Sequence, residues 1–321
     1  MKKIVIAGAG AIGNYIGIQL CKNNFNVVFL GSTRVVAAEK KWGITLEYPN
    51  NIKEYYAPSS LPFTTDPACC NDADLVIITV KSLVTEKLIQ QIKPYADHTT
   101  TLLTLQNGIS NAKILKAAFP DNPVCGGMVT FNVIEKPSST FRLTTNGEIY
   151  LEKIAPSLLP VFQAASMAVK EHDNMESILW AKLLLNLINP LNALSGKSLK
   201  QNLEDHDFRL QWAACMREGL AVLKAAGIKP AKVTPLPTYF LPFMVSLPNW
   251  IYLTLAKNMT DMDPDAKSSM AQDIEKGNKS EIDYLSGEII KLGKATGVKT
   301  LMNEKIYTAI KKTENGRSGG I

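Results

Sequence analysis

The chain has 321 residues and a mass of 35.2 kDa, enough for about two domains that each bury a core of their own. Hydrophobic residues make up 46% and charged residues 20%, so the composition is that of a globular protein and excludes disordered, collagen-like and coiled-coil chains. The 35 basic and 29 acidic residues give a net charge of +6, which is spread over both halves of the chain. No stretch combines clustered lysines and arginines with aromatic residues, so no nucleic acid is expected as a partner.

The cysteine and histidine patterns predict neither a metal site nor a disulfide framework. The five cysteines form no CxxC pair, and the three histidines lie far apart in the sequence. Reduced thiols are typical of the cytoplasm. The N-terminus enters a strand-like run without the charged and apolar regions of a signal peptide, so we expect a cytoplasmic protein.

The first half of the chain alternates strand patterns with helix patterns. Apolar runs and shorter polar runs predict strands at 3–7, 26–30, 44–48, 52–57, 72–80, 101–105, 123–134 and 147–152. Helices are expected to end near Asn23 and Ile92, and a further helix is expected at 157–170. The alternation is typical of a doubly wound α/β sheet, and we predict an N-terminal Rossmann-type NADP-binding domain over residues 1–172.

The second half has no strand signals beyond about residue 173. Helical periodicity is present at 174–189, 207–226, 267–276, 280–295 and 301–312. We therefore predict an all-helical C-terminal domain over residues 173–321, which would carry substrate and catalytic residues.

Residues 233–256 contain no charged residue and are flanked by lysines. The length is that of a membrane-spanning helix. However, each interior proline removes a helix hydrogen bond, and four prolines lie in the stretch, namely Pro235, Pro237, Pro242 and Pro248. Instead of a membrane span, we expect a helical segment broken by the prolines, which is buried, lines a groove or forms a homodimer contact.

The first motif with chemistry is Gly8-x-Gly10-x-x-Gly13, which follows the first strand directly and begins a helix. In this context the spacing is the fingerprint of a dinucleotide-binding turn. Gly8 permits the tight turn, Gly10 lets the backbone approach a pyrophosphate, and Gly13 lets the helix pack closely on the strand. The candidate cofactor-binding residues of this turn are Gly8, Gly10, Ala11, Ile12 and Gly13.

The residues after the second strand favour NADP over NAD. An NAD site usually has Asp or Glu there for the ribose 2′-hydroxyl, but this chain continues from Leu30 through Ser32 to Arg34 with no acid before Glu39. Hydroxyl groups and a guanidinium suit a 2′-phosphate. We expect NADPH, with Ser32 and Arg34 at the phosphate; an uninvolved surface arginine is the alternative.

A helix that is expected to begin near Ser177 carries three polar residues on one stripe. At about 100° per residue, Asn186 lies roughly 40° from Lys182 and Asn189 lies roughly 20° to its other side. The other residues between them are leucine and isoleucine, so the helix should be buried and its lysine should face a cleft, a partner or a ligand. Pro190 should kink or end the helix. The alternative is a lysine whose charged end reaches solvent.

Residues 268–287 hold more polar side chains than a solvated helix face needs. Ser280 and Asp283 have the spacing of a capping box, in which case Glu281 would be an ordinary first-turn acid. A structural role and a functional role therefore both stay open for Glu281 at this point.

Taken together, these stretches resemble the ketopantoate reductase (2-dehydropantoate 2-reductase) family over almost the whole chain. The resemblance rests on GAGAIG at the start, ITVKS with Lys81 and TLQNG with Asn107 at two strand ends, WAKLLLN and NPLNAL in the helical half, and SSMAQDIEKGNKSEIDYLSG. The last segment is the most specific, because Ser269 and Glu281 fall at the spacing that the family uses. The combination is more diagnostic than any single part.

The resemblance implies an enzyme that reduces ketopantoate, a 2-oxo acid, to pantoate with NADPH in pantothenate and coenzyme A biosynthesis. Lys182 matches the family's proton donor to the carbonyl oxygen, and Glu281 matches the acid that hydrogen-bonds the developing hydroxyl. Lys81 and Asn107 match contacts to cofactor and substrate in a cleft between the domains. The implied substrate-binding residues are Asn107, Asn186, Asn189 and Ser269.

Departures from the family pattern concern cofactor and substrate recognition. Two residues, and not the usual three, separate Asn186 from Asn189. Ser32 stands where the family often has arginine, so Arg34 would take that role. The segment at 228–265 is longer than in compact members.

These departures leave alternatives for the function. One is a related reductase that acts on a different 2-oxo acid. Another is a non-catalytic NADPH-binding sensor, although a sensor has no need of Lys182 and Glu281. A dehydrogenase for 3-hydroxy acids or sugar phosphates would need a cluster of arginines and lysines near the site, which the sequence does not show.

Overall fold

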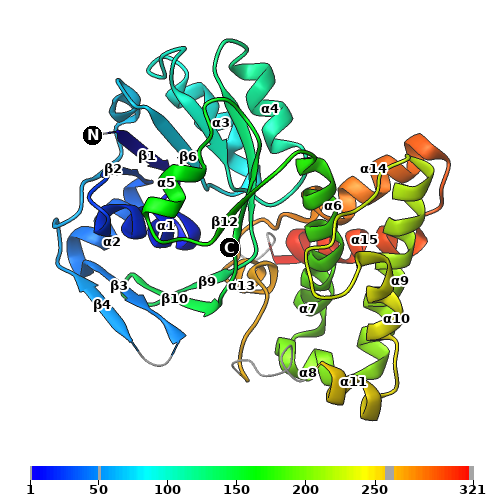
Figure 1. The fold of residues 1–321 in the computed structure, drawn as a ribbon. Coiled ribbons are helices and arrows are strands. Elements are labelled where there is room, and N and C mark those ends of the chain that lie inside the picture. The colour runs from blue at the N-terminus through cyan, green and yellow to red at the C-terminus, as the bar shows by residue number, and fades with distance from the viewer. Residues whose placement is uncertain (1, 50–51, 257–263, 318–321) are drawn as a thin grey trace. The chain divides into compact units, whose positions relative to one another are not determined.

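A computed structural model describes residues 2–49, 52–256 and 264–317 (Figure 1). The chain forms two compact units, Met1–Met175 and Glu176–Ile321. The first unit contains two β-sheets with helices on them, and the second is built from helices.

The main sheet of the first unit has eight strands in the order β12-β11-β8-β7-β6-β1-β2-β5. The strands are β1 (Lys3–Ala7), β2 (Asn26–Leu30), β5 (Phe63–Thr64), β6 (Leu75–Ile78), β7 (Thr101–Thr104), β8 (Val124–Val129), β11 (Ile149–Glu152) and β12 (Val169–His172). All neighbouring pairs from β8 to β5 are parallel, while β11 runs antiparallel to β8. The α/β class expected from the sequence is confirmed.

Two hydrophobic cores lie on opposite faces of this sheet, because alternate residues of a strand point to opposite sides. In β1, Ile4 and Ile6 belong to one core, and Val5 and Ala7 belong to the other. The first core also holds residues of α1 (Ala11–Lys22) and α5 (Leu159–Ala164), and the second holds residues of α3 (Thr85–Ile92) and α4 (Asn111–Ala118). Helices on both faces make the sheet doubly wound.

A second sheet of four strands covers part of the first core. Its order is β4-β3-β10-β9, with bounds β3 (Ile44–Glu47), β4 (Lys53–Tyr56), β9 (Asn132–Lys136) and β10 (Thr140–Thr145). Ile44, Leu46, Phe141 and Leu143 face the same core as α1. The strand patterns predict β3 and β4 but not β10, in which only two of six residues are apolar.

From β1, the chain first adds β2 and β5 on one side of the sheet and then adds β6, β7 and β8 on the other side. The strand order therefore has a switch point at β1, which lies between β2 and β6. In open parallel sheets, ligands bind beyond the carboxyl ends of the strands at such a switch point. The loops at this edge begin at Gly8 after β1, Gly31 after β2, Thr79 after β6 and Leu105 after β7. The predicted residues of the first unit follow these four strands.

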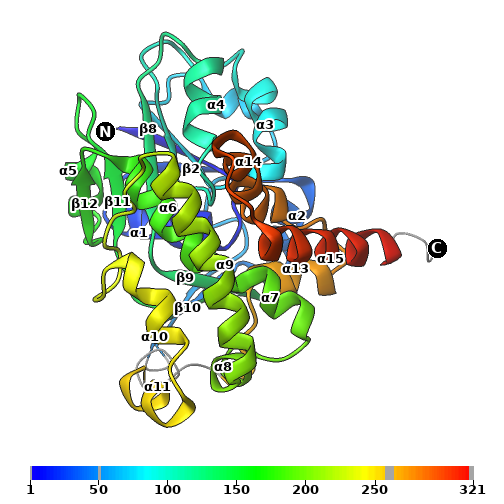
Figure 2. The same ribbon diagram turned by 90° about the vertical axis from the view of Figure 1, so that its right-hand side faces the viewer.

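The second unit is helical throughout the residues that the structure describes (Figure 2). Its helices are α6 (Met175–Asn186), α7 (Ile188–Ser195), α8 (Leu199–Glu204), α9 (His206–Ala225), α10 (Leu241–Val245), α11 (Asn249–Leu255), α13 (Ser269–Glu275), α14 (Ser286–Thr296) and α15 (Leu301–Arg317). Gly219 of α9 lies against Leu184 of α6 and Ile289 of α14 so closely that a Cβ there would clash with Leu184. This close packing fixes α6 in the unit.

Two predicted helices differ from the structure. The helix expected at 157–170 is only α5, because the chain turns at Ser166 with a φ of +57° and then enters the edge strand β12. The helix expected at 280–295 begins at Ser286, after a 3-10 turn at Ile282–Tyr284. In both cases a tertiary contact overrides a locally helical pattern.

The uncharged segment 233–256 forms a 3-10 turn (Thr238–Phe240) followed by α10 and α11, as expected from its prolines. No helix among the described residues is long and apolar enough to cross a membrane. The expectation of burial was right for only part of the segment. Leu241, Val245 and Tyr252 are buried, but several large apolar side chains are 41–77% exposed, namely Leu236, Tyr239, Phe240, Phe243, Trp250 and Leu255.

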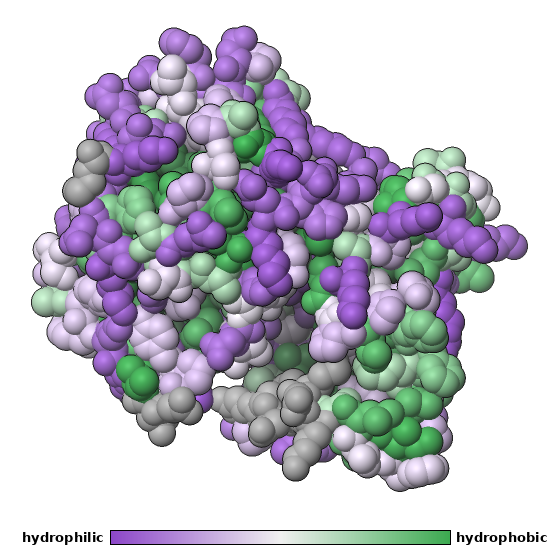
Figure 3. All heavy atoms as spheres, viewed as in Figure 1, coloured by the Kyte–Doolittle hydropathy of each residue, from purple (hydrophilic) through white to green (hydrophobic). Residues whose placement is uncertain are grey.

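This exposure arises because α10 and α11 pack on the unit with one side only. Each helix has one side against the rest of the unit, while its other side carries apolar residues outward, as the green region over α10 and α11 in Figure 3 shows. Arg209 of α9 is fully buried beneath them and donates to the carbonyl oxygens of Val245 (3.1 Å) and Leu247 (3.0 Å). A buried arginine thus joins the ends of α10 and α11 to α9.

Candidate active site

The three glycines of the fingerprint have three different surroundings. Gly8 has a φ of +119°, a conformation that other residues rarely adopt. A Cβ on Gly13 would clash with the carbonyl oxygen of Gly8, so only glycine allows α1 to pack this closely on β1. A Cβ on Gly10 would meet no atom within 4 Å. The turn therefore leaves open space beside Gly10, where the fingerprint predicts a pyrophosphate.

The start of α1 suits an anion. Gly10 is the N-cap and makes no side-chain cap hydrogen bond, and the first turn contains no acidic residue. The N–H groups of the first turn thus have no side-chain acceptor at the positive end of the helix dipole. Thr79 Oγ1 donates to the carbonyl of Gly8 (2.6 Å) and Asn14 Nδ2 to that of Ala9 (2.7 Å), which holds the turn in place.

Ser32 and Arg34 lie at the start of α2 (Thr33–Trp42), directly after β2. Ser32 is the N-cap, and its Oγ accepts from the backbone N–H of Val35 (3.4 Å). The Arg34 side chain is 76% exposed and lies 3.6 Å from a carboxylate oxygen of Glu135 on β9. Such an exposed pair contributes little stability, so the guanidinium is available to a stronger anion.

Lys81 and Asn107 lie at the carboxyl edge of the main sheet, after β6 and β7. The two strands are parallel neighbours, so their carboxyl ends meet at one edge. Both residues are exposed. The carbonyl of Asn107 accepts from Ser82 Oγ (2.9 Å), which connects the two loops.

Lys182 and Asn186 lie on α6, on its least buried side. Leu179, Lys182 and Asn186 are half-buried, whereas Leu183 and Leu184 are 1% exposed. Burial lowers the pKa of Lys182 from its ordinary 10.5 to about 8. The structure gives this lysine no ion pair within the described ranges, and an ammonium group with a lowered pKa is a ready proton donor.

The helix with Lys182 is interrupted at Leu187, as expected from Pro190, and continues as α7. Asn189 therefore lies on a second helix, to which the angle calculated for one uninterrupted helix does not apply. The carbonyl of Asn189 accepts from Ser268 Oγ (3.2 Å), and the side chain of Asn192 accepts from the Ser268 N–H (2.9 Å). These bonds bring the start of α13, where Ser269 is the first residue, next to α7.

Glu281 lies at the start of the 3-10 turn before α14 and is half-buried. The capping box that would have given Glu281 an ordinary role does not form. The backbone N–H of Ser280 donates instead to the carboxylate of Glu314 (2.7 Å). The carboxylate of Asp283 accepts a hydrogen bond from Tyr307 (2.6 Å) and forms an ion pair with Lys311 (2.7 Å). Contacts with α15 thus replace the local cap, since the helix begins only at Ser286.

Four buried polar side chains next to Lys81 and Asn107 were not predicted from the sequence. Gln106, Asn111, Ser82 and Thr85 are all at most 6% exposed and hydrogen-bond to one another. A signal was available for two of them, because Ser82 and Gln106 lie inside the motifs ITVKS and TLQNG. No local pattern points to Asn111 or Thr85.

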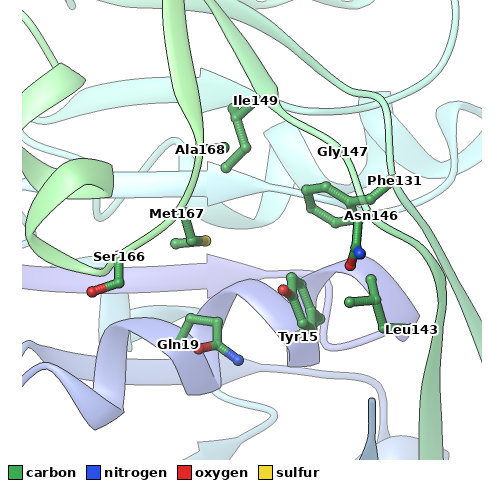
Figure 4. Close-up of a pocket in the computed structure, with 10 residues that line it drawn as sticks. All are labelled: Tyr15, Gln19, Phe131, Leu143, Asn146, Gly147, Ile149, Ser166, Met167 and Ala168. Carbon is green, nitrogen blue, oxygen red and sulfur yellow. The ribbon is translucent and has the colours of Figure 1, made fainter. Parts of the chain in front are cut away.

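A separate pocket in the first unit contains none of the predicted site residues. Figure 4 shows the pocket, whose lining includes Tyr15 and Gln19 of α1, Phe131 and Met167. The other lining residues are Leu143, Asn146, Gly147, Ile149, Ser166 and Ala168. None of these ten residues is an acid, a lysine, an arginine or a histidine.

Comparisons with known proteins cover both units. The family described as Ketopantoate reductase PanE/ApbA matches residues 4–156, and its C-terminal part matches residues 174–314. The 2-dehydropantoate 2-reductase of Pyrococcus horikoshii is 27% identical over 98% of both chains. That of Archaeoglobus fulgidus is 23% identical over 98% of this chain and 99% of the relative.

Solved structures with the same fold include two kinds of enzyme. A PanE/ApbA family ketopantoate reductase from Ralstonia eutropha has a TM-score of 0.84 and 28% identity, and covers 98% of this chain and 99% of that chain. A ternary structure of D-mandelate dehydrogenase with NADH and anilino(oxo)acetate has a TM-score of 0.83 at 21% identity, with the same coverage. The second likeness concerns the fold alone. Both halves of the family pattern match in order, and the chain belongs to the ketopantoate reductase family.

Proposed function

We propose that the protein reduces 2-dehydropantoate (ketopantoate) to pantoate with NADPH, a reaction of pantothenate and coenzyme A biosynthesis. The observation that carries the proposal is Lys182 of α6, a lysine without an ion pair among the described residues, whose pKa burial lowers to about 8. Such a lysine is protonated at neutral pH and readily gives its proton away. The family membership and the names of the relatives support the same reaction.

The first unit fits a nicotinamide dinucleotide. The open space beside Gly10 admits a pyrophosphate, and Ala11, Ile12 and Gly13 would offer their N–H groups to it. When bound, a reduced nicotinamide supplies a hydride to the carbonyl carbon of a 2-oxo acid. Lys81 and Asn107 lie at the carboxyl edge of the same sheet, where they would contact the nicotinamide end of the cofactor and the substrate.

Lys182 would act on the carbonyl oxygen of the substrate. As the carbon is reduced, negative charge develops on that oxygen, and an ammonium group both stabilises the charge and donates the proton. The new bond is O–H, and the lysine is left as the neutral amine. Glu281 would accept a hydrogen bond from the hydroxyl that forms.

The remaining polar residues would orient the substrate. Asn186 and Asn189 carry carboxamides, which donate and accept hydrogen bonds without adding charge. Ser269 lies in the first turn of α13, where a hydroxyl and N–H groups favour a carboxylate. The contact between Ser268 and the Asn189 carbonyl supports a shared role for this part of the second unit.

NADPH is the proposed cofactor because of the residues after β2. The start of α2 has Ser32 as cap and Arg34 in its first turn, and no acidic residue lies there. A guanidinium suits a 2′-phosphate, whereas the ribose hydroxyls of NADH would want a carboxylate. The structures of D-mandelate dehydrogenase, which has the same fold, contain NADH, so titration with both cofactors tests the proposed preference.

A second candidate is a reductase for another 2-oxo acid. It is favoured by the likeness of fold to a protein whose structure contains anilino(oxo)acetate, which is a bulkier oxo acid derivative. The same residues would carry out this reaction, since the proton goes to the same oxygen. A non-catalytic NADPH sensor is the third reading.

One assay distinguishes the three. NADPH oxidation is followed with ketopantoate and with a panel of other 2-oxo acids, for the wild type and for Lys182→Met. Turnover that is highest with ketopantoate and lost in the variant supports the proposal, while higher turnover with another acid supports the second candidate. NADPH binding without turnover of any acid supports a sensor. The homodimer expected from the sequence is tested separately by the molecular mass in solution.

A further inference from the structure

The loops that carry Lys81 and Asn107 are joined by buried side chains. Gln106 Nε2 donates to the backbone carbonyl of Val80 (2.8 Å), so a residue after β7 holds the chain after β6. In the other direction, Ser82 Oγ donates to the carbonyl of Asn107 (2.9 Å). The residue before Lys81 and the residue after it are therefore both tied to the neighbouring loop.

Asn111, at the start of α4, completes the connection. Its Nδ2 donates to the carbonyl of Asn107 (2.7 Å) and to Ser82 Oγ (2.9 Å). The carbonyl of Asn107 thus accepts two hydrogen bonds, which is its full capacity. Asn111 is 2% exposed, so water does not compete for these bonds.

Thr85 connects the two buried amides. Its hydroxyl accepts from Gln106 Nε2 (2.7 Å) and donates to Asn111 Oδ1 (3.2 Å), while Thr104 donates to Gln106 Oε1 (3.0 Å). Backbone carbonyls can only accept, so the orientation of both amides is fixed. The hydrogen bonds therefore form one chain, in which each group donates to the next, from the hydroxyl of Thr104 to the carbonyl of Asn107.

The geometry points to Gln106 and Asn111 as positioning residues that hold Lys81 and Asn107 in place at the carboxyl edge of the sheet. Each amide acts through a backbone carbonyl or a hydroxyl. A fully satisfied buried network is rigid, and losing one member leaves the others without partners. The consequence for turnover rests on the proposed function, because a small misplacement of reacting groups costs much of the rate.

The first arm of the test is amide hydrogen exchange in the ligand-free full-length protein. Asn111→Ala and Thr85→Val are compared with wild type at 80–82 and 107–110, where both variants should exchange faster. Thr85→Val preserves the side-chain volume and serves if Asn111→Ala does not fold. The matched control is Thr100→Val, since Thr100 is also fully buried and donates to the carbonyl of Ala73 (2.8 Å) before the other end of β7.

The second arm is steady-state kinetics with NADPH and the 2-oxo acid that the wild type reduces. We expect kcat/KM to fall roughly 100-fold in Asn111→Ala and roughly tenfold in Thr85→Val. Thr100→Val should lose similar thermal stability and retain its kcat/KM. The stoichiometry of NADPH binding, one per chain, should be the same in all variants, which separates misplacement from unfolding.

The two arms also separate this inference from the proposed function. If exchange at the two loops is no faster in Asn111→Ala and Thr85→Val than in Thr100→Val, the positioning role is wrong whatever the protein catalyses. Faster exchange with unchanged kcat/KM overturns it as well. If the loops loosen and the wild type itself reduces no 2-oxo acid, the positioning of Lys81 and Asn107 stands and the proposed function fails.

Discussion

A lysine has a pKa near 8 only when its surroundings oppose its charge, and at Lys182 the cause is burial, which removes water from the ammonium group. Leu183 and Leu184, beside it on α6, are 1% exposed. The charged form would be costly here without a ligand, and an anionic 2-oxo acid would offset that cost. The same burial that makes the lysine a good proton donor thus favours binding of an anion.

This pKa predicts the pH dependence of the reaction. As the pH rises through about 8, Lys182 loses its proton, and kcat/KM for reduction should fall tenfold per pH unit above that value. Lys182→Arg should abolish this fall of kcat/KM, because arginine stays protonated above pH 12. Lys182→Met should lower kcat by roughly 10²- to 10⁴-fold, because it removes the proton donor. The measurement is the pH–rate profile of the three proteins.

Unfolding would not explain such a loss of activity. The pKa of Lys182 is about 8 in the folded protein and 10.5 ordinarily, so between these values the unfolded chain binds more protons. For this group, the free energy of unfolding therefore rises with pH over that range. If kcat/KM of Lys182→Arg falls above pH 8 in the same way as that of the wild type, Lys182 is not the proton donor.

Arg34 gives a second prediction at the scale of one residue. Its pairing with Glu135 is exposed and 3.6 Å long, so the guanidinium loses little when it turns to a phosphate. Arg34→Ala should raise the Kd for NADPH by roughly tenfold or more, because charge-assisted hydrogen bonds are lost, and should leave the Kd for NADH almost unchanged. Fluorescence titration with both cofactors measures this.

Glu135→Gln is the control for the Arg34 variant. It removes the competing carboxylate and should leave the affinity for NADPH equal or slightly higher. Equal losses for NADPH and NADH in Arg34→Ala would show that this arginine does not distinguish the cofactors.

At the scale of elements, the sequence predicts those features that depend on neighbours in the chain. The turn from β1 to α1 needs Gly8, Gly10 and Gly13 at fixed spacing, and buried strands such as β6 are continuous apolar runs. The interruption after Asn186 was predicted in the same way, because Pro190 lacks the N–H that a continuous helix needs.

Features that depend on distant partners were missed. The helix expected at 280–295 starts late because Glu314 and Lys311, on α15, take the groups that would have formed the local cap. The buried network around Asn111 joins residues that are up to 29 positions apart, and its amides resemble any polar residues in the sequence. Likewise, α10 and α11 are buried on one side only because they pack on α9, and the sequence pattern of 233–256 carries no information about that contact.

Arg209 yields a prediction about the segment formed by α10 and α11. Its guanidinium is fully buried, hydrogen-bonds to Val245, Leu247 and Asn249, and lies 3.9 Å from the centre of the Tyr252 ring. Arg209→Met leaves these acceptors buried without a donor and should lower the free energy of unfolding by roughly 3 kcal/mol. Thermal or urea unfolding measures the change.

The matched control lies on the same helix. Arg217 also donates to this segment, to Ser246 Oγ (2.7 Å), but the bond is exposed. Arg217→Met should therefore change the free energy of unfolding by less than about 0.5 kcal/mol. If both variants lose the same stability, burial of the guanidinium is not what holds α10 and α11 to α9.

At the scale of the whole molecule, the chain divides the predicted chemistry between two units. The fingerprint, Arg34, Lys81 and Asn107 belong to the first unit, and Lys182, Glu281 and the polar residues around Ser269 belong to the second. The net charge of +6 says nothing about this division, since the placed cations are few. A reductase with this division should respond to its two ligands in two different parts of the chain.

Hydrogen exchange of the full-length protein tests that expectation. NADPH alone should slow exchange in the first unit at 8–14, 31–35 and 79–82, because these loops follow β1, β2 and β6 at the switch point. Pantoate added together with NADP⁺ should extend protection to 180–190 and 268–282, which carry the proposed proton donor and carboxylate site. Protection confined to the first unit with both ligands present would remove Lys182 from the reaction and favour the NADPH sensor.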